Sequence, residues 1–166
     1  MRIQIAGEPV EFSFDDLREC YVAPFSLTSW SEFRSENSRP DLRGDRVLLL
    51  LPSNADKHSP HLIASAIDRF IAHQEQLRDA AAAAIVGFIE ELRNDLVIRD
   101  DELDAFEGAH QLRTMIDPSF VRFFPGSARV SIEFECNWDP EHGCGVMFED
   151  MDVIEVGGSD SAHGTD

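Results

Sequence analysis

The hydrophobic residues between positions 60 and 94 recur with the period of an α-helix. They fall three or four residues apart, so that they share one face, at Leu62, Ile63, Ala66, Ile67, Phe70, Ile71, Leu77, Ala81, Ala84, Ile85, Phe88, Ile89 and Leu92. Ser59 and Pro60 suit the start of this helix, because Ser can cap a free N–H and Pro has none to leave unbonded. Either one helix runs from 60 to 94 or two helices meet near residues 73–76. Because neither Gly nor Pro interrupts 73–76, we expect one long helix.

The C-terminal part of the chain changes to the period of a β-strand. Five apolar residues alternate with polar ones, at Val130, Ile132, Phe134, Cys136 and Trp138. This pattern predicts a strand that buries the apolar set and turns Glu133 and Glu135 outward. Two short strands, 145–149 and 152–156, are expected to follow, which predicts a three-stranded meander over about residues 128–157.

The rest of the chain gives weaker signals. Residues 3–14 alternate around Gly7-Glu8-Pro9 and predict a hairpin, and residues 46–51 predict a buried strand. Residues 21–45 mix Ser, Pro and Asn with isolated aromatic residues, and we expect irregular structure there with Trp30 and Phe33 exposed. Residues 100–106 predict a short acidic helix. Residues 112–116 and 120–124 predict two strands on either side of Asp117-Pro118, and Pro125-Gly126 predicts a turn after them.

Together these patterns predict an α+β fold. A long central helix, about residues 60–94, is expected to pack on an antiparallel sheet that ends in the meander. At 166 residues the chain lies within the usual range of one domain. We expect one domain over residues 1–158 and a flexible tail over residues 159–166, which are small and polar.

Composition narrows the class of protein. No apolar run approaches the ~20 residues that cross a bilayer, and the first residues do not resemble a secretory signal. Three cysteines without a C-x-x-C spacing argue against a disulfide framework and against a closed zinc site. We therefore expect a cytoplasmic protein.

The net charge of −18 makes nucleic acid and anionic membranes poor partners and a basic protein a suitable one. The acidic excess is concentrated in residues 98–166, which hold 16 Asp and Glu against 4 Arg. The predicted acidic face comprises eight carboxylates in or beside the meander, Glu133, Glu135, Asp139, Glu141, Glu149, Asp150, Asp152 and Glu155.

The stretch from Trp138 to Val146 is the densest polar cluster and falls between two predicted strands. It has the residues of a structural turn. Asp139 and Pro140 suit the first two positions of a type I turn, Gly143 suits a positive φ, and Gly145 permits a close backbone approach. Trp138 would anchor the turn in the core.

The same stretch also supports a chemical hypothesis. Asp139, Glu141 and His142 could hold a metal ion, with Cys136 or Cys144 as soft donors, and such a metal could be hydrolytic. Beyond this metal, the sequence indicates no cofactor. A Cys144 nucleophile activated by His142 is a weaker hypothesis, because no third group orients the pair.

The motif Trp138-Asp139-x-Glu141-His142-Gly143-x-Gly145-Val146, with the later Val156-Gly157, resembles a family of uncharacterised bacterial domains. The resemblance covers roughly residues 110–158. It implies a stand-alone bacterial cytosolic protein of unknown function, and similar small acidic domains often neighbour toxin systems as immunity proteins. In that family the position of Cys144 is variable.

Three hypotheses follow for the function. The favoured one is a non-enzymatic interaction module, immunity-like or antitoxin-like, whose acidic face binds a basic partner. The second is the metal site at residues 139–142. In the third the motif only shapes a hairpin and the function lies elsewhere, for instance in residues 21–45.

Overall fold

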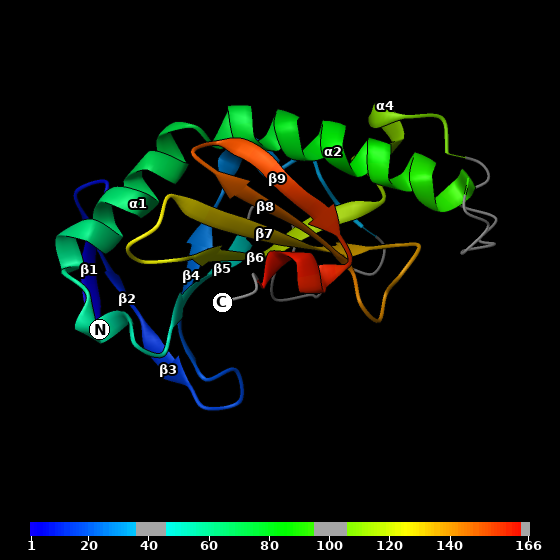
Figure 1. Cartoon of the computed structure of the whole chain (residues 1–166). Helices are drawn as coiled ribbons and strands as arrows, with labels where there is room; N and C mark the ends of the chain where they lie inside the picture. Colours follow the sequence, from blue (N-terminus) through cyan, green and yellow to red (C-terminus); the bar gives the residue numbers. More distant parts are fainter. Residues whose placement is uncertain (36–45, 95–105, 164–166) are drawn as a thin grey trace.

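The computed structural model describes residues 1–35, 46–94 and 106–163 (Figure 1). In chain order the elements are β1 (Arg2–Ile5), β2 (Glu8–Glu11), β3 (Ser13–Asp15), β4 (Cys20–Ser26), η1 (Thr28–Trp30), β5 (Arg46–Pro52), η2 (Ala55–Lys57), α1 (Pro60–Ala72), α2 (Gln74–Asn94), α4 (Ala109–Leu112), β6 (Ile116–Phe123), β7 (Arg129–Cys136), β8 (Cys144–Glu149), β9 (Asp152–Gly157) and η3 (Ser159–Ala162). The predicted α+β class is confirmed.

Strands β3 to β9 form one seven-stranded sheet in which neighbours in space are also neighbours in sequence. Every adjacent pair is antiparallel except β5 and β6, which are parallel. A parallel pair needs a long crossover, and α1, α2 and α4 lie in that connection. The sheet is therefore mixed rather than wholly antiparallel. Strands β1 and β2 form a separate hairpin beside α1.

The main core lies between one face of the sheet and the two long helices, which run end to end along that side of the molecule (Figure 1). Helix α2 buries residues at helical spacing, Leu77, Ala81, Ile85 and Ile89. Strand β7 buries Val130, Ile132, Phe134 and Cys136, as its alternation predicts. Among the helices in the described part of the chain, none is long and apolar enough to cross a membrane.

The helical region breaks at His73, so the expectation of one helix from 60 to 94 is wrong and the two-helix alternative is correct. The N–H of His73 still donates to the carbonyl oxygens of Arg69 and Phe70, but its φ of −114° and ψ of 13° are not helical, and α1 ends there. The side chain of Gln74, the first residue of α2, then bonds to Ser29, 45 residues away in sequence. This contact joins segments that are distant in sequence, and no Gly or Pro at residues 73–76 marks the break between the helices.

Residues 21–35 are ordered, contrary to the prediction of irregular structure. They contain most of β4, which pairs along its length with β5, and the short η1. Trp30 and Phe33 are buried rather than exposed, and the Trp30 ring lies 5.2 Å from that of Phe33 and 5.4 Å from that of Phe134. Residues 36–45 lie outside the described residues.

Two further predictions around β6 need correction. Residues 109–112 form the short helix α4, and a single strand, β6, runs through Asp117-Pro118, where the sequence predicts the gap between two strands. An irregularity in its pairing with β7 between Pro118 and Phe120 accommodates the residue that lacks an N–H. The predicted acidic helix at 100–106 falls almost wholly outside the described residues.

The C-terminal end also departs from expectation. Residues 159–162, assigned to a flexible tail from sequence, form η3, which contacts β7, β8 and β9. Ala162 is fully buried there.

We predict that Leu49→Ala lowers the free energy of unfolding by about 2–5 kcal/mol, because Leu49 is fully buried in a central strand and truncation leaves a cavity. Leu62→Ala makes the same chemical change on α1, where 59% of the side chain is exposed, and should cost less than about 0.5 kcal/mol. Urea denaturation of both variants measures the difference. Equal losses would contradict this assignment of the core.

Candidate functional site

The turn between β7 and β8 is closed by Asp139. Its Oδ1 accepts a hydrogen bond from the backbone N–H of His142 at 3.1 Å and lies 3.0 Å from Nδ1 of the same residue. Its carbonyl oxygen accepts a hydrogen bond from the N–H of Gly143 at 2.7 Å. Asp139 thus folds onto downstream N–H groups, as the sequence predicts for a turn.

The glycines of this turn have separate structural roles. Gly143 has a φ of +66°, and a Cβ there would meet the carbonyl oxygen of Phe134. A Cβ on Gly145 would lie 2.8 Å from the backbone nitrogen of Ala162, so this glycine lets η3 approach the sheet. Trp138 is buried in the core. The predicted positive φ, close approach and anchor are all confirmed.

Beside the turn lies a cleft of about 180 Å³. Its walls come from four places in the chain, β6, β7, the turn and η3, with the lining residues Ser119, Phe120, Glu133, Phe134, Glu135, Pro140, Glu141, His142, Gly143 and Ser159. Glu133 and Glu135 alternate with the core-facing residues of β7, so they point to the face of the sheet that α1 and α2 do not cover.

Three of the predicted acidic residues meet at this cleft. Glu133 is largely enclosed, with 13% of its side chain exposed; its Oε1 lies 3.4 Å from Nη2 of Arg122 and 3.3 Å from Nε2 of His163. Glu135 is half-buried. Glu141 is exposed, and it makes no hydrogen bond or ion pair with any residue that the structure describes.

Residues 23–163 match a family described as a domain of unknown function (DUF6985). The chain belongs to this family. The match extends well beyond the resemblance at residues 110–158 and takes in β5 to η3, and with them the cleft. No curated protein and no solved structure matches the chain.

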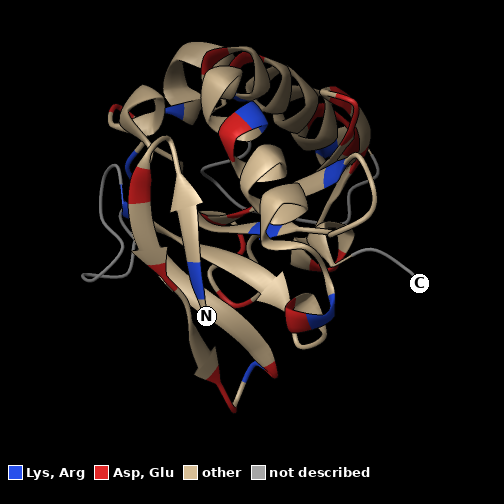
Figure 2. Cartoon of the chain, turned by 90° about the vertical axis from the view of Figure 1, so that its left-hand side faces the viewer, with Lys and Arg blue, Asp and Glu red and all other residues tan. Residues whose placement is uncertain are grey.

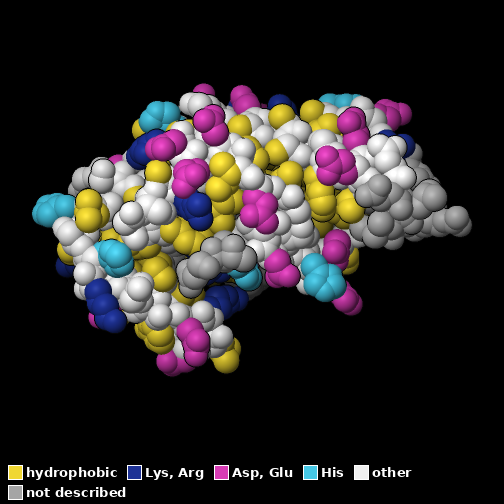
Figure 3. Space-filling view, in the orientation of Figure 1, with side chains coloured by type: hydrophobic (Ala, Val, Ile, Leu, Met, Phe, Trp, Pro, Cys, Tyr) yellow, Lys and Arg dark blue, Asp and Glu magenta, His cyan; other side chains and the backbone are white. Residues whose placement is uncertain are grey.

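The other carboxylates of the predicted acidic face lie elsewhere. Glu149, Asp150 and Asp152 surround the β8–β9 turn, at the end of β8 opposite the β7–β8 turn, and Glu155 lies along β9. Two of them have basic partners, Glu149 with Arg129 at 3.0 Å and Asp150 with Arg69 at 3.1 Å. Acidic and basic positions are interspersed over the helices and turns (Figure 2), and acidic side chains are scattered over the face shown in Figure 3. The carboxylates at the cleft and those around the β8–β9 turn therefore lie at opposite ends of β8.

The proposed metal donors are not gathered around one point. Within residues 1–35, 46–94 and 106–163, no group of three or more His, Cys, Asp and Glu side chains is placed to hold a metal ion. Asp139 instead directs its carboxylate to His142. Cys136 and Cys144 are buried in the core, so neither presents a thiol to solvent beside His142.

Burial also makes the thiols poor nucleophiles. It raises the pKa of Cys136 to about 12 and that of Cys144 well above its usual range, and it raises the pKa of Cys20. A raised pKa leaves little thiolate near neutral pH.

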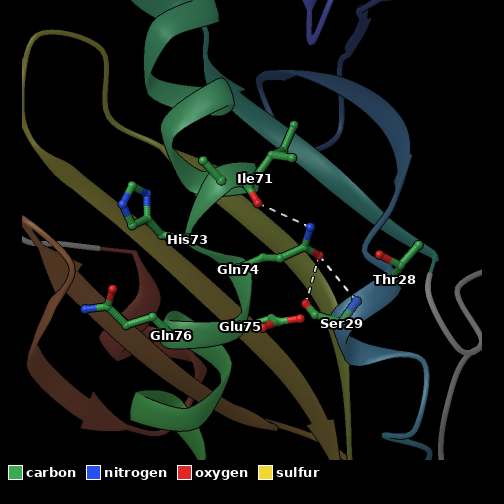
Figure 4. Close-up of a pocket in the computed structure, with 8 residues that line it drawn as sticks. Thr28, Ser29, Ile71, His73, Gln74, Glu75 and Gln76 are labelled. Atoms are coloured by element: carbon green, nitrogen blue, oxygen red, sulfur yellow. Dashed lines mark hydrogen bonds between the residues drawn. The ribbon is translucent and has the colours of Figure 1, made fainter.

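A larger hollow of about 510 Å³ lies where α1 meets α2, beside η1 (Figure 4). This hollow was not predicted, because it depends on the helix break at His73, and one continuous helix was expected there. Gln74 spans it: Oε1 accepts hydrogen bonds from the N–H and the hydroxyl of Ser29, and Nε2 donates to the carbonyl oxygen of Ile71. These groups bond to one another, so they clamp η1 to the helices.

We predict that Gly143→Ala destabilises the protein by at least about 1 kcal/mol, because the added Cβ is strained at positive φ and meets Phe134. Gly158→Ala is the control. Gly158 has a φ of −60° and nothing within 4 Å of the added Cβ. The Gly158→Ala variant should therefore change the free energy of unfolding by less than about 0.5 kcal/mol, and its melting temperature should shift correspondingly little. Thermal unfolding followed by circular dichroism compares the two, and an unchanged Gly143→Ala protein would contradict the assigned role.

We predict that a chromogenic disulfide reagent at about pH 8 labels none of the three thiols rapidly in the native protein, since burial raises their pKa values and blocks access. All three should react at once in denaturant. Rapid labelling of one native thiol would show that it is accessible as thiolate.

Proposed function

We propose that this chain is a non-enzymatic interaction module of the bacterial cytoplasm, immunity-like or antitoxin-like, that binds a basic partner protein at the cleft beside the β7–β8 turn. The cleft would receive a Lys or Arg side chain of the partner. The observation that carries this proposal is the position of Glu141.

Glu141 has no evident structural task. Its neighbours in the turn have one each: Trp138 anchors the turn, Asp139 closes it, and Gly143 permits its backbone path. Glu141 lies exposed at the cleft and makes no hydrogen bond or ion pair within the described residues. An exposed carboxylate at the mouth of a concave site is suited to contact a cation from outside.

The lining of the cleft suits an organic cation. Glu135 and Glu141 supply acceptor oxygens, and Phe120, which pairs with Glu133 across the strands and is only partly buried, supplies apolar surface for the aliphatic part of a long basic side chain. The chain already shows this kind of contact, because the guanidinium of Arg18 lies 5.4 Å from the centre of the Phe120 ring. The net charge of −18 would speed the encounter with a basic partner.

We predict that Glu141→Gln weakens binding of a fluorescein-labelled hexaarginine peptide about two- to fivefold, the effect of losing one largely exposed ion pair. The control is Asp152→Asn, which removes the same charge at the far end of β8 and β9 and should leave affinity unchanged. Fluorescence anisotropy measures both, with salt raised from about 0.05 M to about 0.5 M to confirm that the attraction is screened.

Equal affinities for the two variants would show attraction by net charge alone and would refute the cleft as the binding site. The metal hypothesis is tested on the same samples. A rise in melting temperature on adding zinc, manganese or calcium, abolished in an Asp139→Ala, His142→Ala double variant, would favour that alternative instead.

A further inference from the structure

The C-terminal segment 158–163 lies against the far side of β7, β8 and β9, at the edge of the cleft. The hydroxyl of Ser131 donates to the carbonyl oxygen of Ala162 at 2.5 Å, and the Ala162 methyl is buried. Gly145 and Gly157 make room for it, since a Cβ on Gly145 would lie 2.9 Å from Cβ of Ala162 and one on Gly157 would meet Oγ of Ser161. The sheet is thus shaped to receive this segment.

The segment also brings its own nitrogen donor to the cleft. Nε2 of His163 lies 3.3 Å from Oε1 of Glu133, a largely enclosed carboxylate of the lining, and Ser159 forms part of the same wall. Arg122 reaches the same oxygen from β6, where the ladder fixes its backbone. His163 therefore covers from the solvent side an oxygen that an incoming basic group could use.

We propose that residues 158–163 form an autoinhibitory strap. The imidazole of His163 contacts the carboxylate of Glu133, and a basic partner must displace the strap to engage that carboxylate. This inference rests on the proposed function of the cleft.

The contacts of the strap are few enough for displacement. Within the described residues, one side chain of the segment is fully buried, that of Ala162. The segment packs closely over Gly145 and Gly157, but only one hydrogen bond, from Ser131, and one side-chain contact, with Glu133, add polar contacts to the sheet. The hydrogen bonds Ser161 N–H to Gly158 and His163 N–H to Asp160 lie within the strap itself and do not hold it to β7 or β8. Segments with so few hydrogen bonds to the rest of the fold open locally without global unfolding.

The test measures hexaarginine affinity of His163→Ala by fluorescence anisotropy. Removing the competitor should tighten binding about two- to fivefold, the range for one partly exposed ion pair. The control is His110→Ala. It removes a histidine of α4 whose acidic neighbour is Glu107, and it should leave the affinity for hexaarginine unchanged. Unchanged or weaker binding of His163→Ala relative to the control overturns the strap, whatever the Glu141→Gln result.

A second measurement does not depend on a variant. Saturating the wild-type protein with hexaarginine should accelerate hydrogen exchange at the N–H groups of Ser161 and His163, because a displaced strap loses its support on the sheet. Unchanged exchange at these two amides overturns the proposal. If Glu141→Gln weakens binding while both strap measurements fail, the cleft stands and the strap does not; if Glu141→Gln equals its control, the cleft itself is refuted.

Discussion

Burial of α1 and α2 against one face of the sheet is the constraint on which the rest of the structure depends. It requires every second residue of the central strands to be apolar, and β7 meets this with Val130, Ile132 and Phe134. The residues between them are then obliged to face the other way. Glu133 and Glu135 reach the far side of the sheet for this reason, and a carboxylate cleft can form only on the face that the helices leave uncovered.

The far face is not left open to water throughout. Arg122 and Glu133 are neighbours across β6 and β7, and both are mostly enclosed, so their pairing offsets part of the cost of taking two charges out of solvent. The segment that ends in His163 adds cover from outside. A single carboxylate thus links the sheet, the cleft and the C-terminal segment, although residues 122, 133 and 163 are far apart in sequence.

The parts of the fold that could be predicted from sequence are those in which one face alone is buried. Period two located β7, and period 3.6 located the helical region as a whole but not its division into two helices, because each element buries one side and exposes the other. Strand β4 was missed, since its two buried residues, Cys20 and Ala23, are three positions apart rather than two and Pro24 interrupts the pattern. The end of α1 at His73 depends on Ser29 holding Gln74, a contact between distant segments that local spacing does not encode.

The candidate site likewise has a part that local sequence predicts and a part that it does not. Turn chemistry in the sequence was enough to assign Asp139 and Gly143, because each answers a local backbone requirement; for Gly145 it indicated a close backbone approach but not that the approaching segment is η3. The cleft could not be predicted, since its walls come from four separate elements and one of them, η3, consists of small polar residues typical of a frayed end. Its order comes from glycines 145 and 157, which leave space for it on the sheet.

The contrast between Glu141 and its neighbours follows from this division. A turn residue that closes the backbone, fills the core or tolerates positive φ is explained once the hairpin is formed. Glu141 does none of these, and its charge is solvated within the described structure. Replacing it should therefore leave the hairpin intact, so that any loss of binding can be ascribed to the lost carboxylate rather than to a damaged fold.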